Sequence, residues 1–336
     1  RDKVLNLIGI GNFAAGTFIN GFDSDNAIFF KTSKFAFISN TPIHTELRDI
    51  NEFKVVHLST SDTLRLYAVH LKANNTSADQ QQRAREVDSL RKVTNALPLN
   101  SNFIVLGDFN FYSANEPAYA KLLQIISGSE GHFIDMLNMP GTWNNPSYAI
   151  YHTQSPRVRA FGGGSTGGMD DRFDLILYSK AVSEPGIITM IPQSMTSYGN
   201  DGNHYNDSIN RPPNNAVGQL IANALHYGSD HLPILALFKF ESPIGIKPIS
   251  TEIPNRFKLY QNYPNPFNPS TNIRYMLTKT DNVIMKIYDI SGREVRTLVN
   301  ERLNAGEREV VWNGLDENGN AVASGTYFVK LQTSNG

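Results

Sequence analysis

The feature that most constrains the fold is a change of pattern near residue 240. Before it, short apolar runs alternate with helical patterns and long polar stretches. Residues 241–256 contain three prolines and are typical of a linker. After them come only short alternating segments separated by turn pairs such as Asn318-Gly319. We therefore expect two domains, residues 1–240 and 257–336, joined by a linker at 241–256.

The first domain shows a mixture of strand and helix patterns without a regular βαβ repeat. Residues 77–97 show the clearest helical pattern, because apolar residues recur there every three or four positions. A second helix is expected at 117–126, with its proline in the first turn. The expected strands, by their apolar and β-branched runs, are 27–31, 35–38, 53–58, 64–71, 103–106, 173–178 and 232–240, the third and fourth forming a hairpin. This mixture predicts a two-sheet α/β sandwich for the first domain. The alternating segments of the second domain predict a small all-β sandwich.

Composition excludes several classes of site and partner. The chain has no cysteine, which rules out disulfides, thiolate metal sites and cysteine nucleophiles. A formal net charge of −1 argues against a strongly basic, non-specific nucleic-acid binder, but it leaves open a nuclease with a local basic rim. No apolar run approaches the ~18 residues that a membrane span needs.

Polar residues that can do chemistry follow several of the apolar strands. Strand ends are where rigid scaffolds present active-site groups. These residues are Arg48, His70, Asp108, Asn110, Asp174, Asp230 and His231. A phosphodiester repels nucleophiles, so its hydrolysis calls for a hard cation, an activated water and donors for the developing charge. The carboxylates and imidazoles of this set are the residue types that such a reaction needs.

Two of these clusters, Gly107-Asp108-Phe109-Asn110 and Ser229-Asp230-His231, carry a resemblance to a known family. Together with the strand before His70 and the strand that begins at Asp174, they resemble the deoxyribonuclease-I-like endonuclease/exonuclease/phosphatase superfamily. The resemblance covers residues 16–240. It implies a deoxyribonuclease-I-like α/β sandwich and a metal-dependent hydrolase acting on phosphoric esters.

The resemblance also implies roles for the individual residues. Asp108 and Asn110 would orient and deprotonate the attacking water, and Asp230 with Asp108 would hold Mg²⁺, with Mn²⁺ or Ca²⁺ as alternatives. Asp174 would hydrogen-bond His231 and fix its tautomer and charge. His231 and His70 would contact the scissile phosphate. Arg48, Asn110 and His70 form the expected substrate-binding set.

The family pattern opens with a strand bearing an asparagine and a strand ending in a metal-binding glutamate. Residues 1–26 contain no glutamate. We expect that the N-terminal strands are truncated in this sequence. The alternative is a degenerate, inactive relative, which would act as a non-catalytic surface-binding protein on a decayed enzyme scaffold.

The second domain resembles the type IX secretion C-terminal sorting domain. The resemblance rests on residues 257–271, on Ile287-Tyr-Asp-Ile-Ser-Gly-Arg293 and on Ser324-Gly-Thr-Tyr-Phe328. It implies an immunoglobulin-like β-sandwich, the type IX secretion machinery as a partner, and a secreted or cell-surface protein. The alternative is a carbohydrate- or protein-binding β-module with Trp312 and Tyr263 as ligand aromatics.

The sequence thus predicts a secreted, metal-dependent phosphoesterase that hydrolyses phosphodiester bonds as a monomer. An extracellular nuclease acting on nucleic acid is the leading prediction. A sphingomyelinase- or phospholipase-like phosphodiesterase and a sugar-phosphate phosphatase stay open, because the superfamily uses one site for all of them. The sequence does not choose between endo- and exonuclease action or between the metals.

Overall fold

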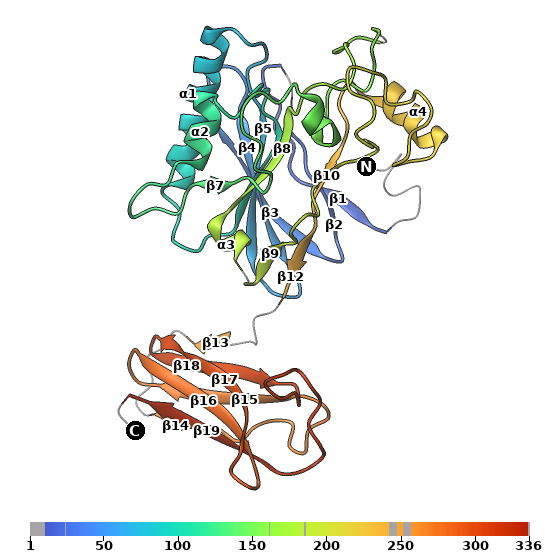
Figure 1. Cartoon of the computed structure of the whole chain (residues 1–336). Coiled ribbons are helices and arrows are strands. Elements are labelled where there is room, and N and C mark those ends of the chain that lie inside the picture. The colour runs from blue at the N-terminus through green and yellow to red at the C-terminus, as the bar shows by residue number, and fades with distance from the viewer. Residues whose placement is uncertain are drawn as a thin grey trace. The chain divides into compact units, whose positions relative to one another are not determined.

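The chain divides into two compact units, residues 1–241 and 242–336, in a computed structural model (Figure 1). The structure describes residues 11–23, 25–160, 162–184, 186–241, 247–250 and 257–334. Each unit has sheets of its own. None of the helices in these ranges is long and apolar enough to cross a lipid bilayer.

The larger unit is built on a six-stranded sheet with the order β3-β4-β5-β6-β8-β7. Its strands are β3 (Phe35–Ile43), β4 (Ile50–His57), β5 (Thr63–His70), β6 (Phe103–Asp108), β7 (Phe133–Ile134) and β8 (Asp174–Ser179). The β5–β6 pair is parallel and the other neighbouring pairs are antiparallel. The predicted hairpin of residues 53–58 and 64–71 is confirmed as the antiparallel pair β4–β5.

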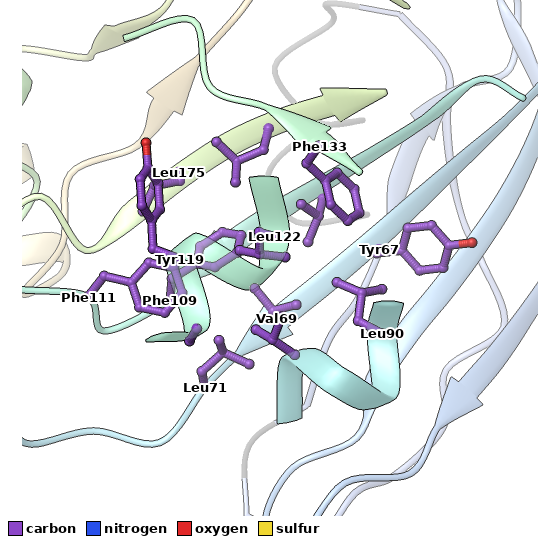
Figure 2. Packing of buried hydrophobic residues seen from close by; sticks show 14 of the residues in the cluster. Tyr67, Val69, Leu71, Leu90, Phe109, Phe111, Tyr119, Leu122, Phe133 and Leu175 are labelled. Atoms are coloured by element: carbon purple, nitrogen blue, oxygen red, sulfur yellow. The ribbon is translucent and has the colours of Figure 1, made fainter. Parts of the chain in front are cut away.

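Two helices, α1 (Ser77–Thr94) and α2 (Pro117–Leu123), cover one face of this sheet. Figure 2 shows side chains of the sheet, such as Tyr67 and Val69, packed with Leu90 of α1 and Leu122 of α2. A capping box of Thr76 and Asp79 fixes the start of α1. Both helices end a few residues earlier than the sequence predicted. At the end of α2, the Arg91 guanidinium takes up the carbonyls that another helical turn would use.

The opposite face of the sheet is covered by short strands. Residues that alternate with the helix-facing ones, such as Leu64, Ile104 and Ile176, pack against them in a second core. These strands are β9 (Ile188–Met190), β10 (Thr196–Ser197), β11 (Ile234–Leu235) and β12 (Phe238–Phe240), which pair as β9–β12 and β10–β11. Sheet layers and helices therefore form the mixed α/β sandwich that the sequence predicted.

The predicted buried strand at 232–240 is wrong in its continuity. The segment is split into β11 and β12, and Leu235 and Leu237 are 48% and 60% exposed. A two-stranded layer is covered on one face only, so alternate apolar residues point outward. The unit is completed by β1 (Phe13–Ala15), β2 (Phe29–Lys31), the 3₁₀ helix at Pro146–Tyr151, α3 (Lys180–Ser183) and α4 (Gln219–Gly228).

The smaller unit is made of strands throughout its described residues, as predicted. One sheet has the order β13-β18-β15-β14 and the other β17-β16-β19, and all neighbouring pairs are antiparallel. The strands are β13 (Lys247–Ser250), β14 (Lys258–Leu259), β15 (Thr271–Leu277), β16 (Asp281–Asp289), β17 (Glu294–Leu303), β18 (Gly306–Trp312) and β19 (Tyr327–Thr333). Trp312 lies in the core, 2% exposed, which removes it from the alternative set of ligand aromatics.

The predicted linker at 241–256 is only partly within the described residues. Residues 242–246 and 251–256 lie outside them. Lys247–Ser250 form β13, an edge strand that pairs with β18, which differs from the linker predicted there. Pro248 is compatible with this position because an edge strand leaves one side of its backbone unpaired.

Candidate active site

Three predicted site residues lie side by side across the centre of the six-stranded sheet. The β5–β6 register pairs His70 with Asp108, and the β6–β8 register pairs Asp108 with Asp174. Because side chains alternate along a strand, all three point to the face opposite the helices. Positions far apart in the sequence are thus brought together at one end of the central strands, on one face of the sheet.

The close approach of β5 and β6 near the ends of the two strands depends on Gly107. Its φ is +130°, and a Cβ at this position would lie 2.1 Å from the Val69 carbonyl oxygen. Only glycine fits both the backbone conformation and the space. The glycine before Asp108 is therefore needed to bring the carboxylate and His70 together.

His231 joins this row from the loop between α4 and β11. Its Nδ1 lies 2.7 Å from Asp174 Oδ2, and its Nε2 lies 3.9 Å from Asp108 Oδ2. Burial lowers the pKa of His231, but the hydrogen bond and charge of Asp174, helped by Asp108 and Asp230, outweigh it and raise the pKa to about 9. The ring is therefore an imidazolium at neutral pH, a cationic donor of the kind that suits a phosphate oxygen.

Asp108 has the opposite perturbation. Burial raises its pKa to about 7; the nearby His231 charge opposes the rise, and Asp174 adds to it. Its Oδ1 accepts the Asn110 backbone N–H at 2.9 Å, and its Oδ2 lies 3.6 Å from His70 Nε2. A carboxyl group that titrates near neutral pH can accept a proton from a water molecule.

Asn110 is 5% exposed and has a positive φ of 53°. Its side-chain nitrogen donates to the Leu71 carbonyl at 3.2 Å, which ties the turn after β6 to the end of β5. Asparagine tolerates this left-handed backbone region better than most residues. The structure therefore gives Asn110 a role in holding the turn beside Asp108, and its predicted roles in catalysis and substrate binding stay predictions.

Arg48 lies near His70 but is engaged elsewhere. Its Nε and Nη2 donate to Asp23 Oδ2 at 3.0 and 2.6 Å, and its Nη1 donates to the Leu71 carbonyl at 3.4 Å. Burial lowers the pKa of His70, and the positive charges of Arg48 and His231 lower it further. Arg48 thus supplies positive charge to this side of the site, while its contact with substrate stays a prediction.

Asp230 turns toward the glycine-rich segment 162–168. Its Oδ2 accepts the Ser165 backbone N–H at 2.6 Å, and its Oδ1 lies 3.8 Å from Arg157 Nη2. A Cβ on Gly164 would lie 2.5 Å from Asp230 Oδ2, so this glycine leaves room for the carboxylate. The contact between the glycine-rich segment and Asp230 is a finding of the structure.

The described residues do not make up a complete metal site. Within the described ranges given above, no group of three or more histidine, aspartate or glutamate side chains is arranged to hold a metal ion. Each predicted carboxylate already has partners in the protein: Asp108 contacts Asn110 and His70, Asp174 contacts His231, and Asp230 contacts Ser165 and Arg157. Metal binding by Asp108 and Asp230 stays a prediction.

Residues 153 and 154 take part in the site without any signal in the sequence. Thr153 Oγ1 accepts the backbone N–H of Phe173 and of Asp174, at 3.3 and 3.2 Å, and so fixes the start of β8. The Gln154 side-chain nitrogen lies 2.5 Å from His231 Nε2. Both residues lie in a polar stretch without strand or helix periodicity, so no sequence pattern marks them as site residues.

Comparisons with known proteins bear on both units. Residues 269–336 match the family described as FlgD Ig-like domain. The smaller unit therefore carries an immunoglobulin-like match, as expected, but to FlgD, and the role in type IX secretion stays a prediction. No curated protein matches the sequence.

Three solved structures are similar to the larger part of the chain. Zebrafish (D. rerio) TDP2 complexed with single-strand DNA product is 17% identical, with a TM-score of 0.44, over 71% of this chain and 81% of that one. The human Nocturnin catalytic domain with bound sulfate is 17% identical, with a TM-score of 0.41, over 71% and 75%. An endonuclease/exonuclease/phosphatase from Bacteroides vulgatus is 12% identical, with a TM-score of 0.40, over 68% and 77%.

Proposed function

We propose that the larger unit is a hydrolase of phosphoric esters, and specifically of phosphodiesters. The observation that carries this proposal is the row of His70, Asp108 and Asp174 in register across three strands, with His231 hydrogen-bonded to Asp174. The row combines a charged donor with a carboxyl group that can take a proton. Phosphoester hydrolysis needs both within one site.

In this proposal each group has one task. The His231 imidazolium, held by Asp174, donates to a phosphoryl oxygen and stabilises its charge. Asp108, whose pKa is raised to about 7, accepts the proton of the attacking water. His70 is turned to the same face, 3.6 Å from Asp108, and Arg48 adds positive charge beside it.

Nucleic acid is the substrate that we propose first, following the resemblance seen in the sequence, with lipid and small phosphoesters as alternatives. Export by the type IX machinery through residues 257–336, to the medium or the cell surface, belongs to the same proposal. The proposal includes a requirement for Mg²⁺ or a similar cation. A panel of plasmid DNA, RNA, sphingomyelin and sugar phosphates, each with EDTA or with added Mg²⁺, tests substrate class and metal together.

The deciding result of that panel is hydrolysis that Asp108→Asn and His231→Gln each reduce by about 100-fold or more while the fold is kept. The matched control is Asp201→Asn, which removes the carboxylate charge from a similar aspartate–histidine pair, Asp201 and His204 at 2.8 Å. Wild-type turnover in the two site variants would refute the proposed roles. Complete inactivity of the wild-type protein on the whole panel, with metal present, would favour the decayed scaffold.

A further inference from the structure

Gln154 is held in place by backbone pairing on two sides. Its N–H donates to the Asp171 carbonyl at 3.1 Å, and its own carbonyl accepts the Asp171 N–H at 3.0 Å. It also forms a bridge to His231, and the Leu232 N–H donates to the neighbouring Thr153 carbonyl at 2.8 Å. Its Cα is therefore fixed relative to both segments that carry the Asp174–His231 pair.

The flanking residues are buried while the Gln154 side chain lies at the site. Thr153 and Ser155 are 0% and 1% exposed, and Gln154 is half-buried. Its Nε2 lies 2.5 Å from His231 Nε2, whereas Asp108 Oδ2 lies 3.9 Å from that atom, beyond hydrogen-bond distance. The hydrogen-bond partner of His231 Nε2 is thus Gln154 and not Asp108.

The chemistry of the two groups makes this pairing useful in a reaction. His231 Nδ1 faces a carboxylate, which only accepts, so Nδ1 carries a hydrogen in every state. When the ring is neutral, Nε2 has a lone pair and the amide nitrogen of Gln154 donates to it. When the ring is charged, Nε2 carries a hydrogen, and the amide oxygen accepts it after a half-turn of the amide. A carboxamide offers both a donor and an acceptor at one position.

We propose that Gln154 is a positioning residue for His231, holding the imidazole at Nε2 while Asp174 holds it at Nδ1. The inference rests on the proposed phosphoesterase function and adds a residue to it. With Asp174 at Nδ1 and Gln154 at Nε2, the plane of the ring is fixed, and its Nε2–H can be shared between the Gln154 amide oxygen and a phosphoryl oxygen. Small errors in the placement of such a group are costly in rate.

The test compares Gln154→Met with the wild-type full chain. Methionine keeps the length and unbranched shape of glutamine but loses both hydrogen bonds. We expect kcat on the phosphodiester substrate to fall by about 10- to 100-fold with KM within about threefold, because a hydrogen bond to a charged group is lost. The matched control is Gln80→Met on α1, whose side chain bonds Asn75 instead.

A second readout does not depend on activity. In ¹H–¹⁵N spectra of the histidine side chains, Gln154→Met should leave the Nδ1–H signal of His231 protected and make Nε2–H exchange faster with water. Wild-type kcat in this variant, or an unchanged Nε2 signal, would overturn the inference. A rise in KM with kcat unchanged would also overturn it, since Gln154 would then contact substrate directly. If the wild-type protein hydrolyses no phosphoester, the proposed function fails, and the spectra still decide the Gln154–His231 contact.

Discussion

Replacing Asp174 by asparagine removes the charge that holds His231 as an imidazolium. The carboxylate hydrogen bond and charge of Asp174 are the leading causes that raise the pKa of His231 to about 9, against the burial that lowers it. Without them, burial dominates and the pKa should fall to 6.5, the ordinary value, or below. At pH 7.5 the ring would change from mostly charged to mostly neutral.

The same shift predicts a pH dependence of stability. A histidine whose pKa is higher in the folded than in the unfolded protein stabilises the fold below the unfolded value of about 6.5 and loses this contribution as the pH rises through the folded value. A rise in the pKa of His231 from 6.5 to about 9 corresponds to about 3 kcal/mol of folding free energy. The wild-type larger unit should therefore lose stability between pH 6.5 and 9, and Asp174→Asn should lose much less.

Two measurements check this in EDTA-treated protein. Proton NMR of the histidine Cε1–H signals gives the pKa of His231, and urea unfolding at pH 6.5 and pH 9 gives the stabilities. The second tryptophan, Trp312, lies in the smaller unit, so both measurements are made in a Trp312→Phe background, where the fluorescence of the fully buried Trp143 reports on the larger unit. A His231 pKa that stays near 9 in Asp174→Asn would refute the assignment of the shift to Asp174, as would equal wild-type stabilities at both pH values.

Three further substitutions test the packing that supports each unit. Gly107→Ala should destabilise the larger unit by at least about 2 kcal/mol in urea unfolding, because a Cβ meets the Val69 carbonyl in a positive-φ backbone; a loss under 0.5 kcal/mol would contradict the close approach of β5 and β6. Arg83→Met should cost about 3–5 kcal/mol, since it leaves the buried Glu116 carboxylate without its ion pair, and adding Glu116→Gln should recover part of the loss; a double variant no better than the single one would contradict this pairing. Trp312→Ala should cost the smaller unit about 3–5 kcal/mol by circular dichroism melting while Trp143 still reports a native larger unit; an unchanged melt would place Trp312 outside the core.

The sequence predicted the central strands and the helices because their apolar periodicity is a local pattern, visible within each segment. The apolar alternation of β5 and the apolar run in β6 predict both strands and the position of His70 and Asp108 at their ends, whereas the roles of these two residues come from the family resemblance. The boundaries of α2 were missed because its end is set by Arg91, which lies on another helix. The broken strand at 232–240 was missed because burial there depends on which face a neighbouring layer covers.

The sequence predicted only part of the site, because some of its residues lie in loops whose contacts are tertiary. Periodic apolar patterns predict which residues lie in strands. Gln154 lies in an irregular segment, and its position depends on pairing with Asp171 and His231. The orientation of Asp230 toward Ser165 also depends on a loop whose glycines specify backbone freedom but no partner. Side-chain contacts between loops depend on the tertiary fold, so local sequence patterns do not predict them.

The claim that Asp108 and His231 work in one site is tested most directly by the rate of phosphodiester hydrolysis in Asp108→Asn, His231→Gln and the double variant. Groups that act on the same reacting phosphorus lose their effect together, so the double variant should be no slower than the slower single variant by more than about threefold. Losses that simply multiply in the double variant, or a single variant with wild-type turnover, would show that the two residues do not act in a common step.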